Sequence, residues 1–266
     1  MEDDKLKIVD DGFDLNKSYN LSSEISKSIS RVNSIRKKFE MYEPLTELEL
    51  NNLNNMFEEE EIFTSNHIEG NSYNLNDTHF ILETGIPVQG KKLKDANEIV
   101  NLKKAINYSK EYNGDLTEEF IKNLHKLITS NTLSSINNEG NYKTVRNWVG
   151  NLNTNSPQST PKHVEELLEW FYSSENINIL SLASEFKFRF IKIHPFIDGN
   201  GRTSRLIFNY MLTKNGYVPL SILPEDKEDY YKALIKCTEN NTESLGEFMC
   251  GCLVKTYERR IEKLED

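Results

Sequence analysis

Apolar residues recur at intervals of three and four along most of the chain, the spacing that puts side chains on one face of an α-helix. The first such stripe runs from Leu21 to Phe39. A Thr46-Glu-Leu-Glu49 capping box begins a second helix that continues to about Glu69, where Gly70 suits a left-handed cap. The pattern predicts an all-α fold, with further helices at about 95–112, 117–130, 161–172, 181–193, 203–215, 225–239 and 243–262.

One stretch departs from helical spacing. Residues 141–150 are rich in aromatic and β-branched side chains and are bounded by glycines, which predicts a short β-hairpin, and a polar loop follows over 151–160. We expect three regions: an N-terminal helical arm over 1–45, loosely attached; a second helical region over 46–94; and the main body over 95–266. The stripe from Leu21 to Phe39 fits a second copy as well as the core, so a homodimer stays open.

Composition narrows the class of protein. The 266 residues carry a net charge of −10, which argues against a non-specific nucleic-acid binder. No apolar run is long enough to span a bilayer, and Met1-Glu-Asp-Asp-Lys lacks the basic start of a signal peptide. Three cysteines near the C-terminus form no disulfide framework. We therefore expect a soluble, cytoplasmic protein.

A loop reading His194-Pro-Phe-Ile-Asp-Gly-Asn-Gly-Arg-Thr-Ser-Arg205 carries the candidate chemistry. The helix before it, ending at Ile193, has an apolar face, and Asp198-Gly and Asn200-Gly supply two turn signals in succession. The next helix points its N-terminus into the loop, where free N–H groups and the helix dipole favour an anion.

The side chains of the loop suit the same ligand. Arg202 and Arg205, three residues apart, share a helix face and can grip adjacent phosphates. Asp198 offers a hard oxygen ligand for Mg²⁺, and His194 can take a proton near neutral pH. Together these groups predict phosphoryl or nucleotidyl transfer.

Other polar residues have plainer interpretations. His67 and His79 are expected at the surface rather than as metal ligands, and His125 as a packed or capping residue of an apolar helix face. The acidic run Glu58–Glu61 is expected to be a solvated face. Tyr230 and Tyr231 taken alone are ordinary core aromatics.

The twelve-residue loop matches every fixed position of the signature of the Fic family, His-Pro-Phe-x-Asp/Glu-Gly-Asn-Gly-Arg-x-x-Arg. The chain resembles this family from about Thr64 to the last helix, and resembles most the type with an N-terminal inhibitory helix, whose motif matches Ser65-Asn-His-Ile-Glu69-Gly70. The hairpin resembles the family's flap, best at 147–150. The region 46–94 would then be the inhibitory region and 95–266 the Fic catalytic core.

The resemblance implies a protein adenylyltransferase that uses ATP and Mg²⁺ or Mn²⁺. His194 would be the general base and Asp198 the metal ligand. Ser65, Glu69 and Gly70 would form the inhibitory motif, with Glu69 paired to Arg205 in the γ-phosphate site. The nucleotide-binding residues implied are Gly199, Asn200, Gly201, Arg202, Arg205, Tyr230, Tyr231, Val149 and Gly150.

The implied partners are ATP and a protein with an exposed Ser, Thr or Tyr, the chain itself included. No nucleic acid or membrane is expected. Three alternatives stay open: a bifunctional or mainly de-AMPylating enzyme that uses Glu69, transfer of a group other than AMP, and a catalytically silent regulatory module. Two positions depart from close relatives, Lys143 in the flap and Thr238 near the base.

Overall fold

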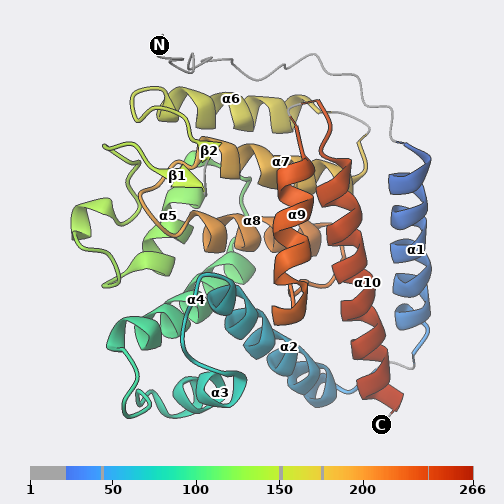
Figure 1. The fold of residues 1–266 in the computed structure, drawn as a ribbon. Coiled ribbons are helices and arrows are strands. Elements are labelled where there is room, and N and C mark those ends of the chain that lie inside the picture. Colours follow the sequence, from blue (N-terminus) through green and yellow to red (C-terminus); the bar gives the residue numbers. More distant parts are fainter. Residues whose placement is uncertain (1–21, 43–44, 150–151, 175–176, 239, 266) are drawn as a thin grey trace.

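The computed structural model describes residues 22–42, 45–149, 152–174, 177–238 and 240–265 (Figure 1). Within these ranges helices dominate, which confirms the all-α class. The helices are α1 (Ser23–Glu40), α2 (Glu47–Ile68), α3 (Leu75–Thr84), α4 (Leu93–Glu111), α5 (Glu118–Thr129), α6 (Thr160–Ser173), α7 (Ile179–Ile193), α8 (Asn200–Lys214), α9 (Lys227–Lys236) and α10 (Glu243–Glu265), with 3-10 turns η1 (Ile136–Asn138) and η2 (Pro224–Asp226). None of the described helices is long and apolar enough to cross a bilayer.

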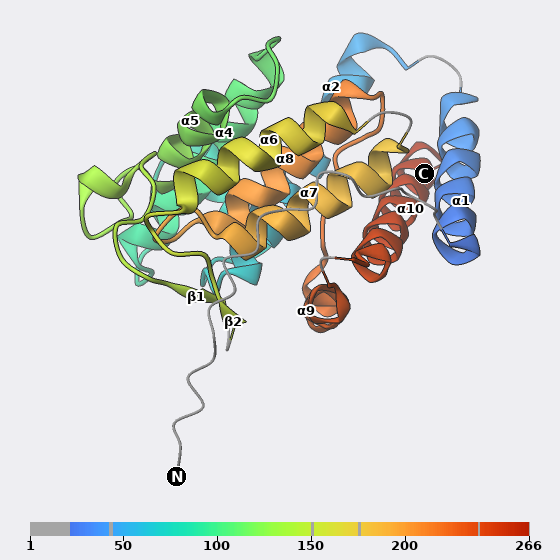
Figure 2. The ribbon, with the colours of Figure 1, turned by 90° about the horizontal axis from the view of Figure 1, so that it is seen from above.

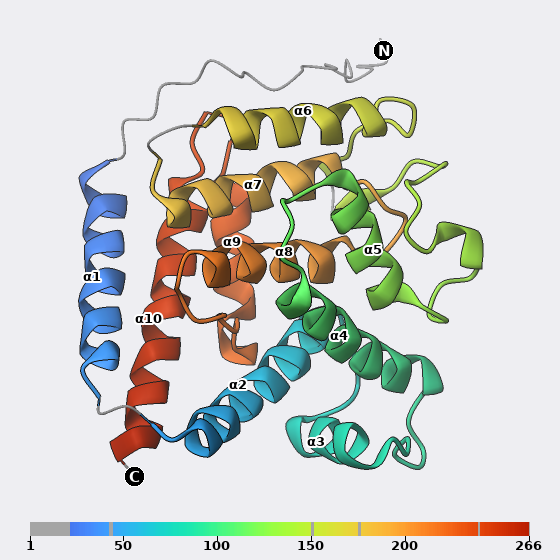
Figure 3. The same ribbon diagram turned by 180° about the vertical axis from the view of Figure 1, so that it is seen from behind.

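The central element is α7, which packs against α6, α8 and α10 (Figure 1). It is buried nearly all round, as expected of a helix in the middle of a core. Helix α8 packs against α4 and α5 as well as against α7 (Figure 3). The loop between α7 and α8 is therefore held by two buried helices, as the sequence predicts.

The arm at the N-terminus belongs to the core over its described part. Helix α1 packs along α10, and Ile25, Ile29 and Val32 of its apolar stripe are buried there (Figure 2). A Cβ at Gly246 of α10 would lie 3.0 Å from the Ile25 side chain, so the two helices are in close contact. The stripe is thus satisfied within this chain, and the expectation of a loosely attached segment is wrong for 23–40.

Helix α3 was not predicted. Asn74 and Asp77 form a capping box at its start, and Gly85 ends it with φ of 69°. Only Thr78 and Ile81 of its residues are buried. Because two buried positions make no recognisable stripe, the helix shows in the sequence only through its two ends.

The acidic run on α2 is not a solvated face, and that expectation is wrong. Successive residues on a helix project about 100° apart, so the four carboxylates reach four different helices. Glu58 is ion-paired with Lys103 and Lys110 of α4, and Glu59 lies 3.0 Å from Nδ1 of His79 on α3. Glu60 accepts from Arg259 of α10 at 2.6 Å, and Glu61 accepts from Asn209 of α8 at 2.8 Å.

The hairpin lies later in the chain than predicted. Strands β1 (Trp148–Val149) and β2 (Leu152–Asn153) pair antiparallel, with Trp148 opposite Asn153. The second strand therefore falls in the stretch expected to be a polar loop, while 141–147 has no strand. The hydroxyl of Thr154 donates to the Asn147 carbonyl at 2.8 Å and joins the two ends of this short hairpin.

Candidate active site

The loop between α7 and α8 turns twice through left-handed backbone. His194 ends α7 with φ of 48°, and Gly199 begins α8 with φ of 80°. Asn200 and Gly201 already belong to α8, so the predicted second turn at Asn200-Gly is wrong. The Asn200 side chain instead bonds the Phe196 backbone twice, accepting at 2.9 Å and donating at 2.8 Å. These bonds fix the loop against the helix N-terminus.

His194 is arranged as a neutral base. Its Nδ1 lies 3.3 Å from the Ile191 carbonyl oxygen, which can only accept, so the ring proton is on Nδ1 and the lone pair is on Nε2. Burial lowers the pKa of His194 to about 4. The imidazole is therefore unprotonated at neutral pH and free to accept a proton through Nε2.

A buried lysine and an asparagine attach the base of the hairpin to this loop. Lys143 Nζ donates to the Ile193 carbonyl at 3.1 Å and to Asn147 Oδ1 at 2.8 Å. The Asn147 amide donates to the Phe196 carbonyl at 2.6 Å. Sequence reasoning noted Lys143 as a departure from the family and Asn147 as part of the flap, but neither as a support of the loop.

His125 of α5 packs against the α7–α8 loop. Its ring is fully buried and stacks on Phe196 at 3.7 Å between centroids. Because Nδ1 accepts from the Gly140 N–H at 3.0 Å, Nε2 carries the proton and donates to the Asp198 carbonyl at 2.9 Å. The expected packing role is confirmed, and the histidine also fixes the backbone that carries Asp198.

Asp198 is exposed beside the N-terminus of α8, and its Oδ1 accepts from the Gly199 N–H at 2.6 Å. Mg²⁺ in nucleotide sites is usually held by one or two carboxylates together with substrate phosphates and water. A single accessible carboxylate next to an anion-binding helix end fits that requirement.

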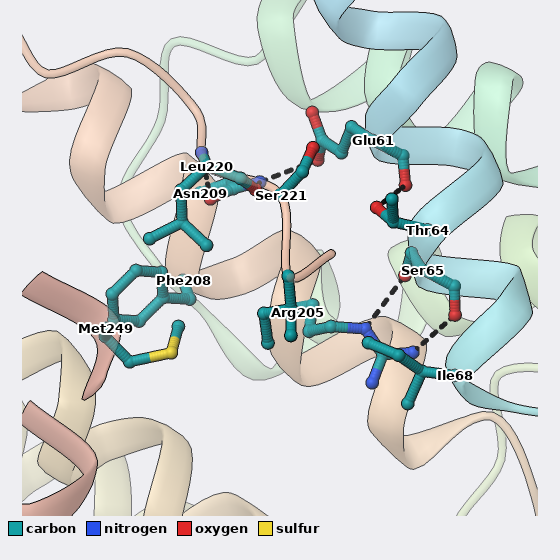
Figure 4. A pocket seen from close by; sticks show the side chains of 11 residues that line it. Glu61, Thr64, Ser65, Ile68, Arg205, Phe208, Asn209, Leu220, Ser221 and Met249 are labelled. Atoms are coloured by element: carbon teal, nitrogen blue, oxygen red, sulfur yellow. Dashed lines mark hydrogen bonds between the residues drawn. The ribbon is translucent and has the colours of Figure 1, made fainter. Parts of the chain in front are cut away.

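The Arg205 side chain connects α8 to α2 (Figure 4). Its Nε donates to Ser65 Oγ at 2.9 Å, and its Nη2 donates to the Ser65 carbonyl at 2.8 Å and to Glu69 Oε1 at 2.7 Å. Burial of Glu69 opposes ionisation, but the charge and hydrogen bond of Arg205 outweigh it and lower the pKa of this carboxyl. Glu69 is therefore a carboxylate at neutral pH.

Glu69 lies where an anion at the start of α8 would be expected. A Cβ built on Gly201 would come within 2.1 Å of Glu69 Oε1, so the carboxylate rests against the bare backbone of the first helical turn. Glycine is required at 201 for this approach. Gly70 follows with φ of 88° and lets the chain turn away after Glu69.

The remaining residues predicted to bind the nucleotide differ in burial and in their partners. Arg202 is buried beside Glu98 of α4 at 3.1 Å, so it does not share the ligands of Arg205, although its charge also lowers the pKa of Glu69. Tyr230 is buried and Tyr231 half-exposed, with their rings 5.3 Å apart. Val149 is described only as a residue of β1, and Gly150 lies outside the described residues.

Known proteins share this fold. Residues 115–212 match the Fic/DOC family, and the chain therefore contains a Fic domain, as its resemblance indicated. It is 28% identical over 203 residues to the protein adenylyltransferase Fic of Nematostella vectensis (74% of this chain, 47% of that protein). It is 32% identical over 202 residues to the enzyme of the same name from Drosophila yakuba (74% and 40%).

Among solved structures, a Fic domain containing signaling protein from Bacteroides thetaiotaomicron aligns with a TM-score of 0.75 at 27% identity, covering 90% of this chain and 96% of that one. The chain spans less than half the length of the two curated relatives. It corresponds in extent to the bacterial protein.

Proposed function

We propose that the chain is a nucleotidyltransferase that transfers AMP from ATP to a Ser, Thr or Tyr hydroxyl of a protein. The observation that carries this proposal is the α7–α8 loop, which combines a neutral histidine, an exposed aspartate and an arginine at one helix N-terminus. The curated relatives named protein adenylyltransferase support the same reaction.

The reaction forms a bond between the target hydroxyl oxygen and the α-phosphorus. The bond from that phosphorus to the oxygen bridging to the β-phosphate breaks, and pyrophosphate leaves. His194 Nε2 takes the hydroxyl proton, because the Ile191 carbonyl keeps Nδ1 protonated and burial keeps the ring neutral. Asp198 would hold Mg²⁺ or Mn²⁺, which neutralises phosphate charge when bound. Arg205 would bind the terminal phosphate.

Glu69 is proposed as an intramolecular inhibitor. Its carboxylate is paired with Arg205 and lies against Gly201, so it competes with a phosphate for both the guanidinium and the helix N-terminus. A second candidate, removal of AMP from a modified protein, draws on the same residue. The Glu69 side chain is 32% exposed and ionised, and so can orient a water beside the loop.

The test of the main proposal uses ATP carrying its label on the α-phosphate or on the γ-phosphate. We expect label to enter protein only from the α-position, and more in a Glu69→Gly variant, because the AMP moiety is transferred and pyrophosphate leaves. Incorporation from the γ-position would indicate phosphate transfer, and release of AMP from a labelled protein would favour the hydrolytic direction.

Removing the proposed metal ligand gives a separate prediction. We expect Asp198→Ala to lose most transfer activity even at saturating ATP, and chelation of divalent cations to abolish transfer by the unmodified chain. Asp115→Ala, which removes an exposed aspartate outside the loop, is the matched control and is expected to keep activity. Full activity in excess chelator would contradict the assignment of Asp198.

A further inference from the structure

A lysine that none of the roles above uses contacts the helical turn that carries Arg205. Lys187 of α7 is 1% exposed. Its Nζ donates to Ser204 Oγ at 2.9 Å and lies 5.4 Å from the ring centroid of Tyr230. In the part of the chain that the structure describes, it is not within ion-pair distance of any carboxylate. A buried amine held only by a hydroxyl and an aromatic ring is an expensive feature for a core.

The charges around this amine belong to the proposed nucleotide site. Burial lowers the pKa of Lys187 well below its ordinary value, and the charge of Arg205 lowers it further. Glu69 acts in the opposite direction. One carboxylate therefore faces two basic side chains. A ligand with several negative charges in the place of Glu69 would act in the same direction as Glu69 and favour the protonated, charged amine.

We propose that Lys187 is a specificity-determining residue, which acts with Arg205 on the terminal phosphates of the nucleotide and makes the site select a triphosphate. Its amine bonds to Ser204, the residue next to Arg205, and the Ser204 hydroxyl donates to the Gly201 carbonyl at 2.9 Å. The amine thus contacts the same helical turn against which Glu69 lies at Gly201. This inference rests on the proposed function, and names the chemistry by which that site distinguishes ATP from ADP and AMP.

Under this proposal, replacing Lys187 weakens ATP binding without lowering the stability of the fold. Methionine has nearly the shape of lysine without the amine, and replacing a buried, unpaired polar group with an apolar one of similar size stabilises a core or leaves it unchanged. We therefore expect Lys187→Met to melt at the same or a higher temperature without nucleotide. A lysine that served packing alone would leave nucleotide selectivity unchanged.

The experiment measures dissociation constants of AMP, ADP and ATP with Mg²⁺, in a Glu69→Gly background that leaves Arg205 accessible. We expect Lys187→Met to weaken ATP binding roughly tenfold or more, the size of one lost charge-assisted interaction, and to leave AMP within about twofold. Lys104→Met removes an exposed lysine of α4 and serves as the matched control. Ser204→Ala, which removes the hydroxyl that holds the amine, is expected to weaken ATP binding in the same direction.

Two outcomes overturn the proposal: unchanged ATP binding in Lys187→Met, or equal weakening for AMP, ADP and ATP. Should Lys187→Met fail to fold, the same comparison in Ser204→Ala decides. Failure of the proposed function looks different, because labelling from α-labelled ATP would then be absent while the nucleotide series still shows whether Lys187 selects the triphosphate.

Discussion

Replacing His194 with alanine is expected to lower the rate of AMP transfer by about 10²–10⁴, the usual contribution of a general base. ATP binding is expected to persist, because neither Asp198, the proposed metal ligand, nor Arg205, the proposed phosphate ligand, depends on the imidazole. The measurement is incorporation of α-labelled ATP together with the nucleotide dissociation constant, both in the Glu69→Gly background so that inhibition does not mask the loss.

The control for this variant is His79→Ala, which removes a largely exposed histidine of α3 and is expected to keep activity. The pH profile adds a second measurement. Since burial lowers the pKa of His194 to about 4, its base form is complete at neutral pH. We expect no fall in rate between about pH 8 and pH 6, where an ordinary histidine begins to protonate. Labelling that survives His194→Ala would remove the histidine from its role.

Replacing Glu69 with glycine is expected to raise self-labelling about tenfold or more, because Arg205 and the Gly201 backbone become available to the nucleotide. Arg205→Ala is expected to abolish the effect rather than copy it, since it removes the phosphate contact together with the inhibitory one. The double variant should then behave as Arg205→Ala alone, a non-additive result typical of two residues that share one interaction.

Thermal stability gives an independent measurement of the same pair. Without nucleotide, Glu69→Gly leaves a largely buried guanidinium without its carboxylate, at a cost of about 1–3 kcal/mol in the free energy of unfolding. The lower end of that range fits a glutamate that is partly exposed. ATP is expected to restore stability as it fills the site. Glu69→Gln, which keeps the shape without the charge, is the intermediate control, and equal labelling by Glu69→Gly and the unmodified chain would contradict the inhibitory role.

The sequence predicts those parts of the site whose determinants are local. The apolar face of α7, the glycine at 199 and the fixed spacing of the loop place His194, Asp198 and Arg205 correctly relative to the buried helices. The Ser65–Glu69 segment was also placed against Arg205, through its family motif. The two motifs each lie within a dozen residues, whereas the contact between Glu69 and Arg205 joins residues far apart in the chain and was indicated only by the family resemblance.

The parts that failed depend on partners far away in the chain. A run of four glutamates looks solvated until α3, α4, α8 and α10 supply a partner for each carboxylate. Glu98 of α4, which is ion-paired with Arg202, could not be placed beside it from the sequence. Helix α3 buries two residues, too few for a stripe. Lys187 was not picked out by the sequence, because α7 carries other charged residues and only its burial distinguishes this lysine from one at the surface.

The contacts that Glu58–Glu61 make with four helices have a consequence for how α2 opens. A rigid departure of this helix would break contacts with four neighbouring helices at once, so we expect its middle to exchange amide protons only through global unfolding. The end differs, because Glu69 is the cap residue and Gly70 already leaves the helix. Fraying of that last turn removes the Glu69 contact of Arg205, while the two hydrogen bonds from Arg205 to Ser65 and the contacts of the acidic run stay in place. A regulator that captured the few residues around Gly70 would therefore separate Glu69 from Arg205, and hydrogen exchange would show protection lost there and kept at 58–61.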